Sequence, residues 1–192
     1  MKLAWFVLLG CFLFSSASYA NKKAPTKLDC TKMACHAVLP GAIRFVKSKK
    51  GPHYAGYDKA GTLKGWMVMS TDVVDVPAYS GKPLVTLVGL NPKGVITGVR
   101  VIHHSEPILL VGIPESKMHD FSKFYVGKKA TSRVVVGKGS KGELAVDVIS
   151  GATVTVLAQN KTILEAARAI GVAEGVISIS QLTPGHFVAS DK

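Results

Sequence analysis

The sequence is short of acidic residues, of cysteine and of long apolar segments. Twelve Asp and Glu face 24 Lys and Arg, so the chain carries a formal charge of +12 at pH 7. This excess favours an acidic partner, an anionic cofactor or a membrane surface, and charge alone does not choose among them. Charged residues make up 19% of the chain and hydrophobic ones 47%, which excludes a disordered polyelectrolyte. No internal repeat is evident, and the 192 residues suit one domain with its own core.

The N-terminus carries the one apolar run that approaches membrane-spanning length, and this run is shorter than the roughly 20 residues that span a bilayer. Lys2 precedes the run at residues 3–14, and Ser18 and Ala20 then frame a cleavage position. This order is typical of a secretory signal peptide at residues 1–20, and the alternative is an uncleaved membrane anchor. We therefore expect a periplasmic or otherwise exported protein, for which membrane association stays open.

Cleavage would remove Cys11 and leave Cys30 and Cys35, in a Lys-rich stretch at residues 21–53 that we predict to be a mobile basic lead-in. In an oxidising compartment such a pair most simply forms a disulfide. His36 follows Cys35 as the histidine of a c-type haem site follows its second cysteine, although four residues separate the cysteines here instead of two. Haem attachment is therefore an alternative, whereas a zinc site lacks a third and a fourth ligand.

The middle of the chain alternates β-rich runs with turns, as antiparallel strands do. Strands are predicted at residues 63–70, 84–90, 95–103, 131–136 and 176–179, and a helix at residues 114–125. We expect Trp66, Phe121 and Tyr125 to be core residues rather than stacking partners of a cofactor.

The clearest helix is predicted at residues 155–170. Its apolar side chains fall on one stripe, with Gln159 and Arg168 largely off it, and Gly171 stands where a left-handed cap would end the helix. Together these elements predict one α+β domain, an antiparallel sheet with helices packed against it.

A stretch rich in small residues opens this helix, and it reads Asp147-Val148-Ile149-Ser150-Gly151-Ala152-Thr153-Val154-Thr155. Unpaired backbone N–H groups and the helix dipole favour an anion at a helix N-terminus, most often a phosphate. Gly151 and Ala152 leave room for a bulky ligand. The alternative is an ordinary helix start, in which Thr153 or Thr155 caps the helix and Asp147 is a solvated acid.

The same stretch resembles the flavinylation motif of FMN-binding domains, found in NosR-type regulators of nitrous oxide respiration and in the RnfG and NqrC subunits of membrane redox pumps. That motif is an Asp, a short spacer, Ser-Gly-Ala-Thr, a hydrophobic residue, then Thr or Ser, and residues 147–155 match it without a gap. In those families an exported flavin transferase moves FMN from FAD onto the threonine hydroxyl. The resemblance implies covalent FMN on Thr153, with Thr155 as the fallback attachment site. Asp147 would then serve in recognition by the transferase or in holding its metal.

The resemblance extends over about residues 39–171 and implies an FMN-binding domain at residues 54–185 with a tail at 186–192. The similar segments are residues 39–42, 70–74, 79–83, 104–108, 111–115 and 124–127. RnfG and NqrC have a Gly-rich loop where this chain has residues 106–110, which favours the NosR branch.

Further candidates for the flavin site come from two of these segments. Residues 79–83 predict a tight turn, in which a backbone N–H or the Lys82 side chain could meet a phosphate or ring oxygen; a plain β-turn is the alternative. The candidate cofactor-binding residues are Asp147, Ser150, Gly151, Ala152, Thr153, Thr155, Ser80, Gly81, Lys82, His104 and Glu106.

The implied function is electron relay between a membrane-bound donor and an exported redox acceptor, after maturation by an ApbE-type flavin transferase. The cofactor would do the electron chemistry, and the protein would orient it. An enzyme with its own nucleophile is disfavoured because no Ser or Cys stands with a His and an acid in a recognisable arrangement. No nucleic-acid partner is expected. Two alternatives stay open: a carrier of flavin and c-type haem that uses Cys30, Cys35 and His36, and a non-redox binding or regulatory module.

Overall fold

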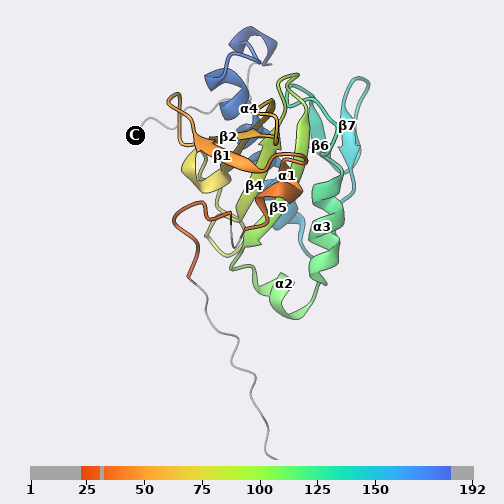
Figure 1. The fold of residues 1–192 in the computed structure, drawn as a ribbon. Helices are drawn as coiled ribbons and strands as arrows, with labels where there is room; N and C mark the ends of the chain where they lie inside the picture. The colour runs from red at the N-terminus through yellow and green to blue at the C-terminus, as the bar shows by residue number, and fades with distance from the viewer. Residues whose placement is uncertain (1–22, 31–32, 183–192) are drawn as a thin grey trace, which may run out of the picture.

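The computed structural model describes residues 23–30 and 33–182 (Figure 1). The predicted signal peptide at residues 1–20 and the tail at 186–192 lie outside the described residues. The elements, in chain order, are α1 (Cys35–Val38), β1 (Arg44–Lys47), β2 (Tyr54–Tyr57), β3 (Leu63–Met69), the 3-10 helix η1 (Ser70–Asp72), β4 (Val85–Leu90), β5 (Ile96–His103), α2 (Pro107–Val111), α3 (Glu115–Lys123), β6 (Val134–Val136), β7 (Leu144–Val146), α4 (Thr153–Ala173) and the 3-10 helix η2 (Ile179–Gln181).

Five antiparallel strands form the main sheet, and each pairs with the next along the chain, in the order β1-β2-β3-β4-β5. The strands predicted at residues 84–90 and 95–103 are β4 and β5, which form a hairpin with Val88 opposite Val99. The predicted α+β class with an antiparallel sheet is confirmed. A second, two-stranded sheet pairs β6 with β7 in parallel, and β7 has no counterpart among the predicted strands.

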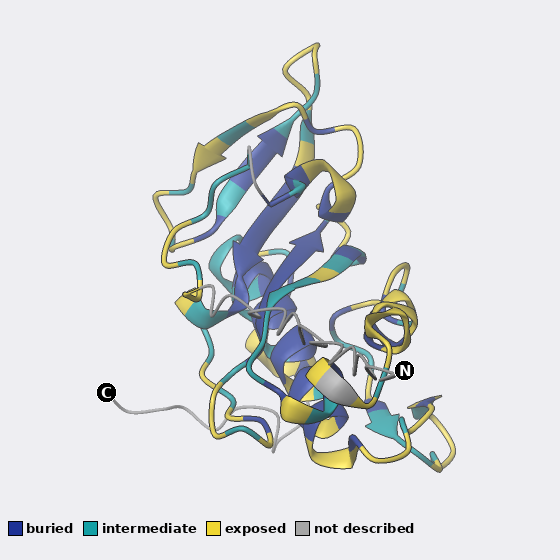
Figure 2. Cartoon of the chain, turned by 90° about the horizontal axis from the view of Figure 1, so that it is seen from below, coloured by how far each residue is buried: buried dark blue, intermediate teal, exposed yellow. Residues whose placement is uncertain are grey.

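Both faces of the sheet are covered, as the buried strands in Figure 2 show. Alternate side chains of β3 point to opposite sides: Val68 packs in a core that includes Val156 and Ile163 of α4, and Met67 packs in a smaller core with Val38 of α1. Burying such a side chain stabilises the fold by about 1.5–3 kcal/mol. The sheet therefore lies between α4 on one face and α1 on the other.

A pair of glycines lets α1 approach the sheet closely. Gly89 and Gly98 face each other across β4 and β5. A Cβ on Gly98 would lie 2.4 Å from the Cα of Val38, and one on Gly89 would lie 2.1 Å from the Val38 carbonyl oxygen. The Thr97 hydroxyl donates a hydrogen bond to that same oxygen at 2.6 Å. The backbone of α1 thus rests directly on the sheet where side chains are absent.

The segment predicted as a mobile lead-in is partly structured, which corrects that expectation. Apolar residues of α1 pack against the sheet, and β1 forms the edge strand beside β2. Cys30 and Cys35 form a disulfide, as the simplest interpretation of the pair predicts. Neither sulfur is then free for the thioether bonds of a c-type haem, so the structure contradicts the haem alternative.

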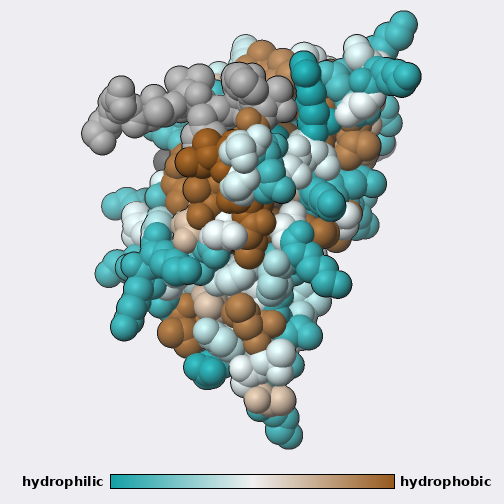
Figure 3. Space-filling view, turned by 90° about the horizontal axis from the view of Figure 1, so that it is seen from above, coloured by the Kyte–Doolittle hydropathy of each residue, from teal (hydrophilic) through white to brown (hydrophobic). Residues whose placement is uncertain are grey.

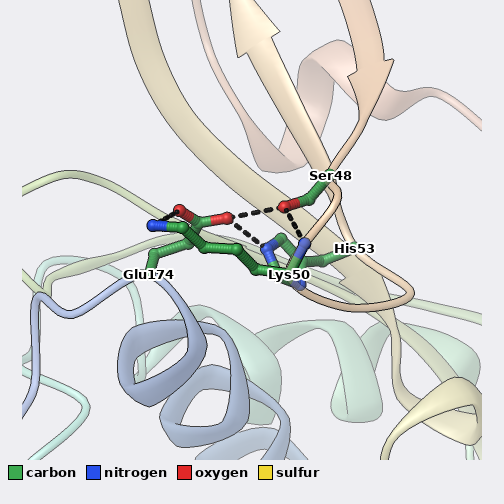
Figure 4. Close-up of polar contacts among 4 residues, drawn as sticks. All are labelled: Ser48, Lys50, His53 and Glu174. Carbon is green, nitrogen blue, oxygen red and sulfur yellow. Dashed lines mark hydrogen bonds and ion pairs between the residues drawn. The ribbon is translucent and has the colours of Figure 1, made fainter.

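A partly buried polar cluster connects the β1–β2 turn to the C-terminal end of α4 (Figure 4). Glu174 accepts hydrogen bonds from Nε2 of the buried His53 at 2.6 Å and from the Ser48 hydroxyl at 2.7 Å, and Lys50 Nζ lies 3.2 Å from its second oxygen. Burial opposes ionisation of Glu174, but these hydrogen bonds and the Lys50 charge lower its pKa below the ordinary value. The lead-in and the last helix are therefore held together by an ionised carboxylate.

The long helix α4 differs from its prediction at both its polar residues and its end. Gln159 and Arg168 are buried rather than off the packed face, because each finds polar partners: Gln159 exchanges hydrogen bonds with Thr86, and Arg168 donates to backbone carbonyls. Gly171 lies inside the helix instead of capping it. A Cβ there would lie 2.3 Å from Cδ1 of Ile177, so the glycine makes room for the chain that folds back.

Smaller differences remain at four places, one of which is β2, a strand that was not predicted. The expected strand at residues 176–179 is absent, and η2 follows instead. α3 is two residues shorter than predicted at its C-terminal end, and α2 was not predicted. Trp66, Phe121 and Tyr125 are buried in the core, as expected. Among the described residues, no helix combines the length and apolar character that a membrane crossing needs.

Candidate functional site

The motif at residues 147–155 forms the loop from β7 into α4 and the first turn of that helix. Gly151 adopts φ +82°, a conformation that glycine reaches without strain. The Ala152 N–H donates to the Ile149 carbonyl at 2.9 Å, and Ala152 is the N-cap, with no side chain capping the helix. The alternative in which Thr153 or Thr155 caps the helix is therefore wrong. The backbone N–H groups in the first turn of α4 therefore have no side-chain cap.

The two threonines of the motif lie in different environments. Thr153 is the first residue of α4 and is exposed. Thr155 is 1% exposed, and its hydroxyl donates a hydrogen bond to the Glu106 carboxylate. Thr153 is thus accessible to solvent, whereas the Thr155 hydroxyl is enclosed. The structure thus distinguishes two hydroxyls that the sequence leaves equivalent.

Glu106 connects three separate segments of the site. It is 0% exposed and precedes α2 as its N-cap. One carboxylate oxygen accepts from Thr155 on α4, and the other accepts from the Ser80 N–H at 2.9 Å. Burial opposes ionisation, yet hydrogen bonds from Ser80, Thr155 and the Tyr79 backbone together lower the pKa of Glu106 below its ordinary value. An ionised carboxylate therefore links the turn, α2 and α4.

The predicted turn at residues 79–83 is present, and it presents its backbone to Glu106. Gly81 adopts φ +75°, and its N–H donates to the Ala78 carbonyl at 2.9 Å. The Lys82 N–H donates to the Ser80 hydroxyl at 3.3 Å, while the Lys82 side chain is exposed. The structure thus brings together Ser80, Glu106 and Thr155, three of the residues that the sequence predicts for the site.

A large cavity of about 1150 Å³ lies between β5 and α3. Lys82 and His104 line it, but no residue of the 147–155 motif does. The pKa of the neighbouring His103 is lowered, first by burial and then by the charges of His104 and Lys82. Lys82 and His104 therefore line a cavity that the 147–155 motif does not reach.

A second cavity, of about 600 Å³, adjoins the motif itself. Asp147 and Ser150 line it from the loop, and Ile113, Phe121 and Phe124 line it from α3 and the residues that flank this helix. Asp147 and Ser150 are exposed. Sequence reasoning missed Phe124 as a wall of this cavity, since only the position of β7 beside α3 brings it there.

Residues 79–168 match the family model of the FMN-binding domain. This segment, just under half of the chain, is therefore recognised as an FMN-binding domain. The matched segment begins at the turn that binds Glu106 and ends in α4, so it contains the whole site described above.

The relatives of this FMN-binding domain include two proteins named Regulatory protein NosR. The one from Pseudomonas aeruginosa is 48% identical over 114 residues, which cover 59% of this chain and 16% of that protein. The one from Stutzerimonas stutzeri is 43% identical over 120 residues, or 62% of this chain and 17% of that protein. The chain thus spans about a sixth of the length of these relatives. A crystal structure of Shewanella oneidensis NqrC aligns with a TM-score of 0.42 and 21% identity over 72% of each chain.

The residues of the FMN-binding domain fit a flavin mononucleotide. The uncapped end of α4 offers N–H groups to a phosphate, and a Cβ on Gly151 would meet only Cδ1 of Ile113, at 3.9 Å. The adjoining cavity falls within the roughly 300–1,000 Å³ of small-molecule pockets and has aromatic walls. Thr153, Gly151 and Ser150 would hold the phosphate end, and the cavity beside them would receive the ring.

Proposed function

We propose that this chain is an exported electron-transfer flavoprotein that carries FMN on Thr153 through a phosphoester. It would relay electrons between a membrane-bound donor and an exported acceptor. The observation that carries the proposal is the contrast between the two hydroxyls, because Thr153 is exposed on an uncapped helix end while Thr155 is enclosed by Glu106.

The attachment step balances as a transfer from FAD. The Thr153 oxygen forms a bond to the FAD phosphorus that is nearer the flavin. The bond between that phosphorus and the bridging pyrophosphate oxygen breaks, so AMP leaves. The proton of the Thr153 hydroxyl is released. An ApbE-type transferase would catalyse this step. Asp147 is exposed in the same loop, where it is accessible for recognition by the transferase or for binding its metal.

The chain's own residues would hold and orient the cofactor. The N–H groups at the start of α4 and the positive end of its dipole stabilise the phosphate charge. Glu106 fixes the first turn of α4 through Thr155, so that the attachment point does not move with the loop. When bound, FMN supplies the electron-transfer chemistry that protein side chains lack.

The surface charge supports docking with acidic partners. The chain carries a formal charge of +12, and Figure 3 shows hydrophilic side chains projecting around one face with smaller apolar areas between them. The electrostatic field of a positively charged protein steers its association with a negatively charged one, and salt screens this field.

Intact mass of the exported protein tests the proposal. Co-expression with an active flavin transferase should add the mass of FMN minus one water, and the denatured band should fluoresce on a gel. Thr153→Ala should abolish the addition. Thr155→Ser, which keeps the hydroxyl bonded to Glu106, is the matched control and should retain it.

Two results would contradict this assignment. One is an unchanged mass under conditions in which the transferase modifies a known target, which would favour a non-redox module of the same fold. The other is a flavin peptide in which the adduct lies on Thr155.

A further inference from the structure

The outer edge of β5 has no strand beside it over most of its length. β5 is the last strand of the sheet and pairs with β4 on its other side (Figure 1). Near its start, Ile96 exchanges backbone hydrogen bonds with Gly127 and Lys128, at 2.8 and 2.9 Å. Within the described part of the chain, residues 98–103 make no backbone hydrogen bond to any segment except β4.

This open edge forms one wall of the cavity of about 1150 Å³. Five successive residues of β5, 99–103, line it, and α3 supplies the opposite wall through residues such as Met118 and Ser122. At about 3.3 Å per residue, five strand residues extend over roughly 17 Å. The cavity exceeds the roughly 300–1,000 Å³ of small-molecule pockets, so its size suits an extended segment of chain better than a compact ligand.

Two buried polar atoms in the cavity wall lack partners among the described residues. Ser122 is 1% exposed, and its hydroxyl makes no hydrogen bond. Nδ1 of His104 is also buried and makes none. Buried polar groups in folded proteins are normally hydrogen-bonded, so both atoms point to a ligand with hydrogen-bonding groups.

The charge of the groove selects the kind of ligand. The exposed side chains of Lys82 and Arg100 line it, and Glu115 is the one carboxylate among its lining residues. A segment with Asp or Glu side chains would complement this charge, and one with Lys or Arg would be repelled.

We propose that an extended, acidic segment of a partner polypeptide binds along β5 as a sixth strand of the sheet. Its backbone pairs with residues 98–103, and its carboxylates lie against Lys82 and Arg100. An exposed sheet edge of this length is a ready template for strand addition. The proposal does not depend on covalent FMN, because the groove contains no residue of the 147–155 motif.

Fluorescence anisotropy of a labelled peptide tests the proposal on the exported chain. The probe alternates Glu and Val over seven residues; one control replaces each Glu by Lys, and another carries N-methyl groups on alternate backbone amides. The acidic probe should bind, and both controls should bind much more weakly. Arg100→Glu should weaken binding about tenfold or more, whereas Arg44→Glu, on the opposite edge strand, should leave it nearly unchanged.

Hydrogen exchange locates the bound peptide. Backbone amides within residues 98–103 should gain protection when the acidic probe is added, and Arg100→Gln, a milder variant, should reduce that protection. The proposal would be overturned if Arg100→Glu and Arg44→Glu weakened peptide binding equally, or if the N-methylated probe bound as well as the acidic probe. Protection of amides outside residues 98–103, or no binding of the acidic probe, would also overturn it. So would a dimer of the chain that pairs through β5, or loss of peptide binding on flavinylation.

Discussion

Replacement of Glu106 by Ala should be among the most damaging single changes outside the apolar core. The carboxylate is 0% exposed and accepts hydrogen bonds from Ser80 and Thr155. Its removal leaves the buried Thr155 hydroxyl without an acceptor, at a cost of about 1–3 kcal/mol, and the half-buried Ser80 N–H without one, at a smaller cost. The sum is a large part of the roughly 5–15 kcal/mol that stabilises a typical domain.

The isosteric variant Glu106→Gln separates charge from packing. Its amide oxygen still accepts from Ser80, and its NH₂ group can donate to the Thr155 oxygen, so we expect a loss of only about 1 kcal/mol. The pKa of Glu106 is lowered in the folded state, so its ionised form adds stability at pH values above the ordinary pKa of Glu. That contribution disappears as the pH falls through the lowered pKa, and the difference between Glu106 and Gln should disappear with it.

Urea unfolding at neutral and acidic pH measures both effects, and the rate of flavinylation measures the consequence for the site. Glu106→Ala should slow modification of Thr153 even at temperatures where the variant is folded, because the first turn of α4 loses its tie. A stability of Glu106→Ala within about 0.5 kcal/mol of the wild type, as for an ordinary surface change, would refute the role assigned to this carboxylate.

Three further predictions concern the lead-in and its contacts. Glu174→Gln should lower the free energy of unfolding by about 1–3 kcal/mol at pH 7. This loss should shrink as the pH falls, because the pKa of Glu174 is lowered in the folded state. A loss of stability that grows in acid would contradict this. The double change Cys30→Ser and Cys35→Ser, which opens a loop with a sequence separation of 5, should cost about 2 kcal/mol in urea unfolding, and an unchanged midpoint would count against a formed disulfide. Gly98→Val should displace α1, because a Cβ there would lie 2.4 Å from the Cα of Val38. We expect the free energy of unfolding to fall by about 3 kcal/mol or more, as measured by thermal unfolding. A variant as stable as wild type would show that α1 does not rest on the sheet.

Local patterns were enough to predict most strands and the long helix. Alternating apolar residues and turn sequences identified β3, β4 and β5 to within one residue, since period and turn chemistry are properties of neighbouring residues. α1 escaped prediction because it depends on distant glycines and a disulfide, and β1 because it depends on pairing with β2; a Lys-rich stretch reveals neither.

The candidate site was predicted in its members but not in its arrangement. Ser80, Glu106 and Thr155 were all candidates, yet only the fold brings Glu106 to a hydroxyl 49 residues away and thereby separates the roles of the two threonines. Burial of Gln159 and Arg168 was missed for a similar reason, since a polar side chain can enter a core when distant groups satisfy it.

The hydrogen bond between Glu106 and Thr155 limits how far a group attached at Thr153 could move. A group esterified at Thr153 would turn about bonds that start from an immobilised helical turn, so its reach equals the length of its own linker and nothing more. Electron exchange would then require the other protein to approach this corner of the molecule, and the distance at closest approach would be fixed by how the two surfaces meet.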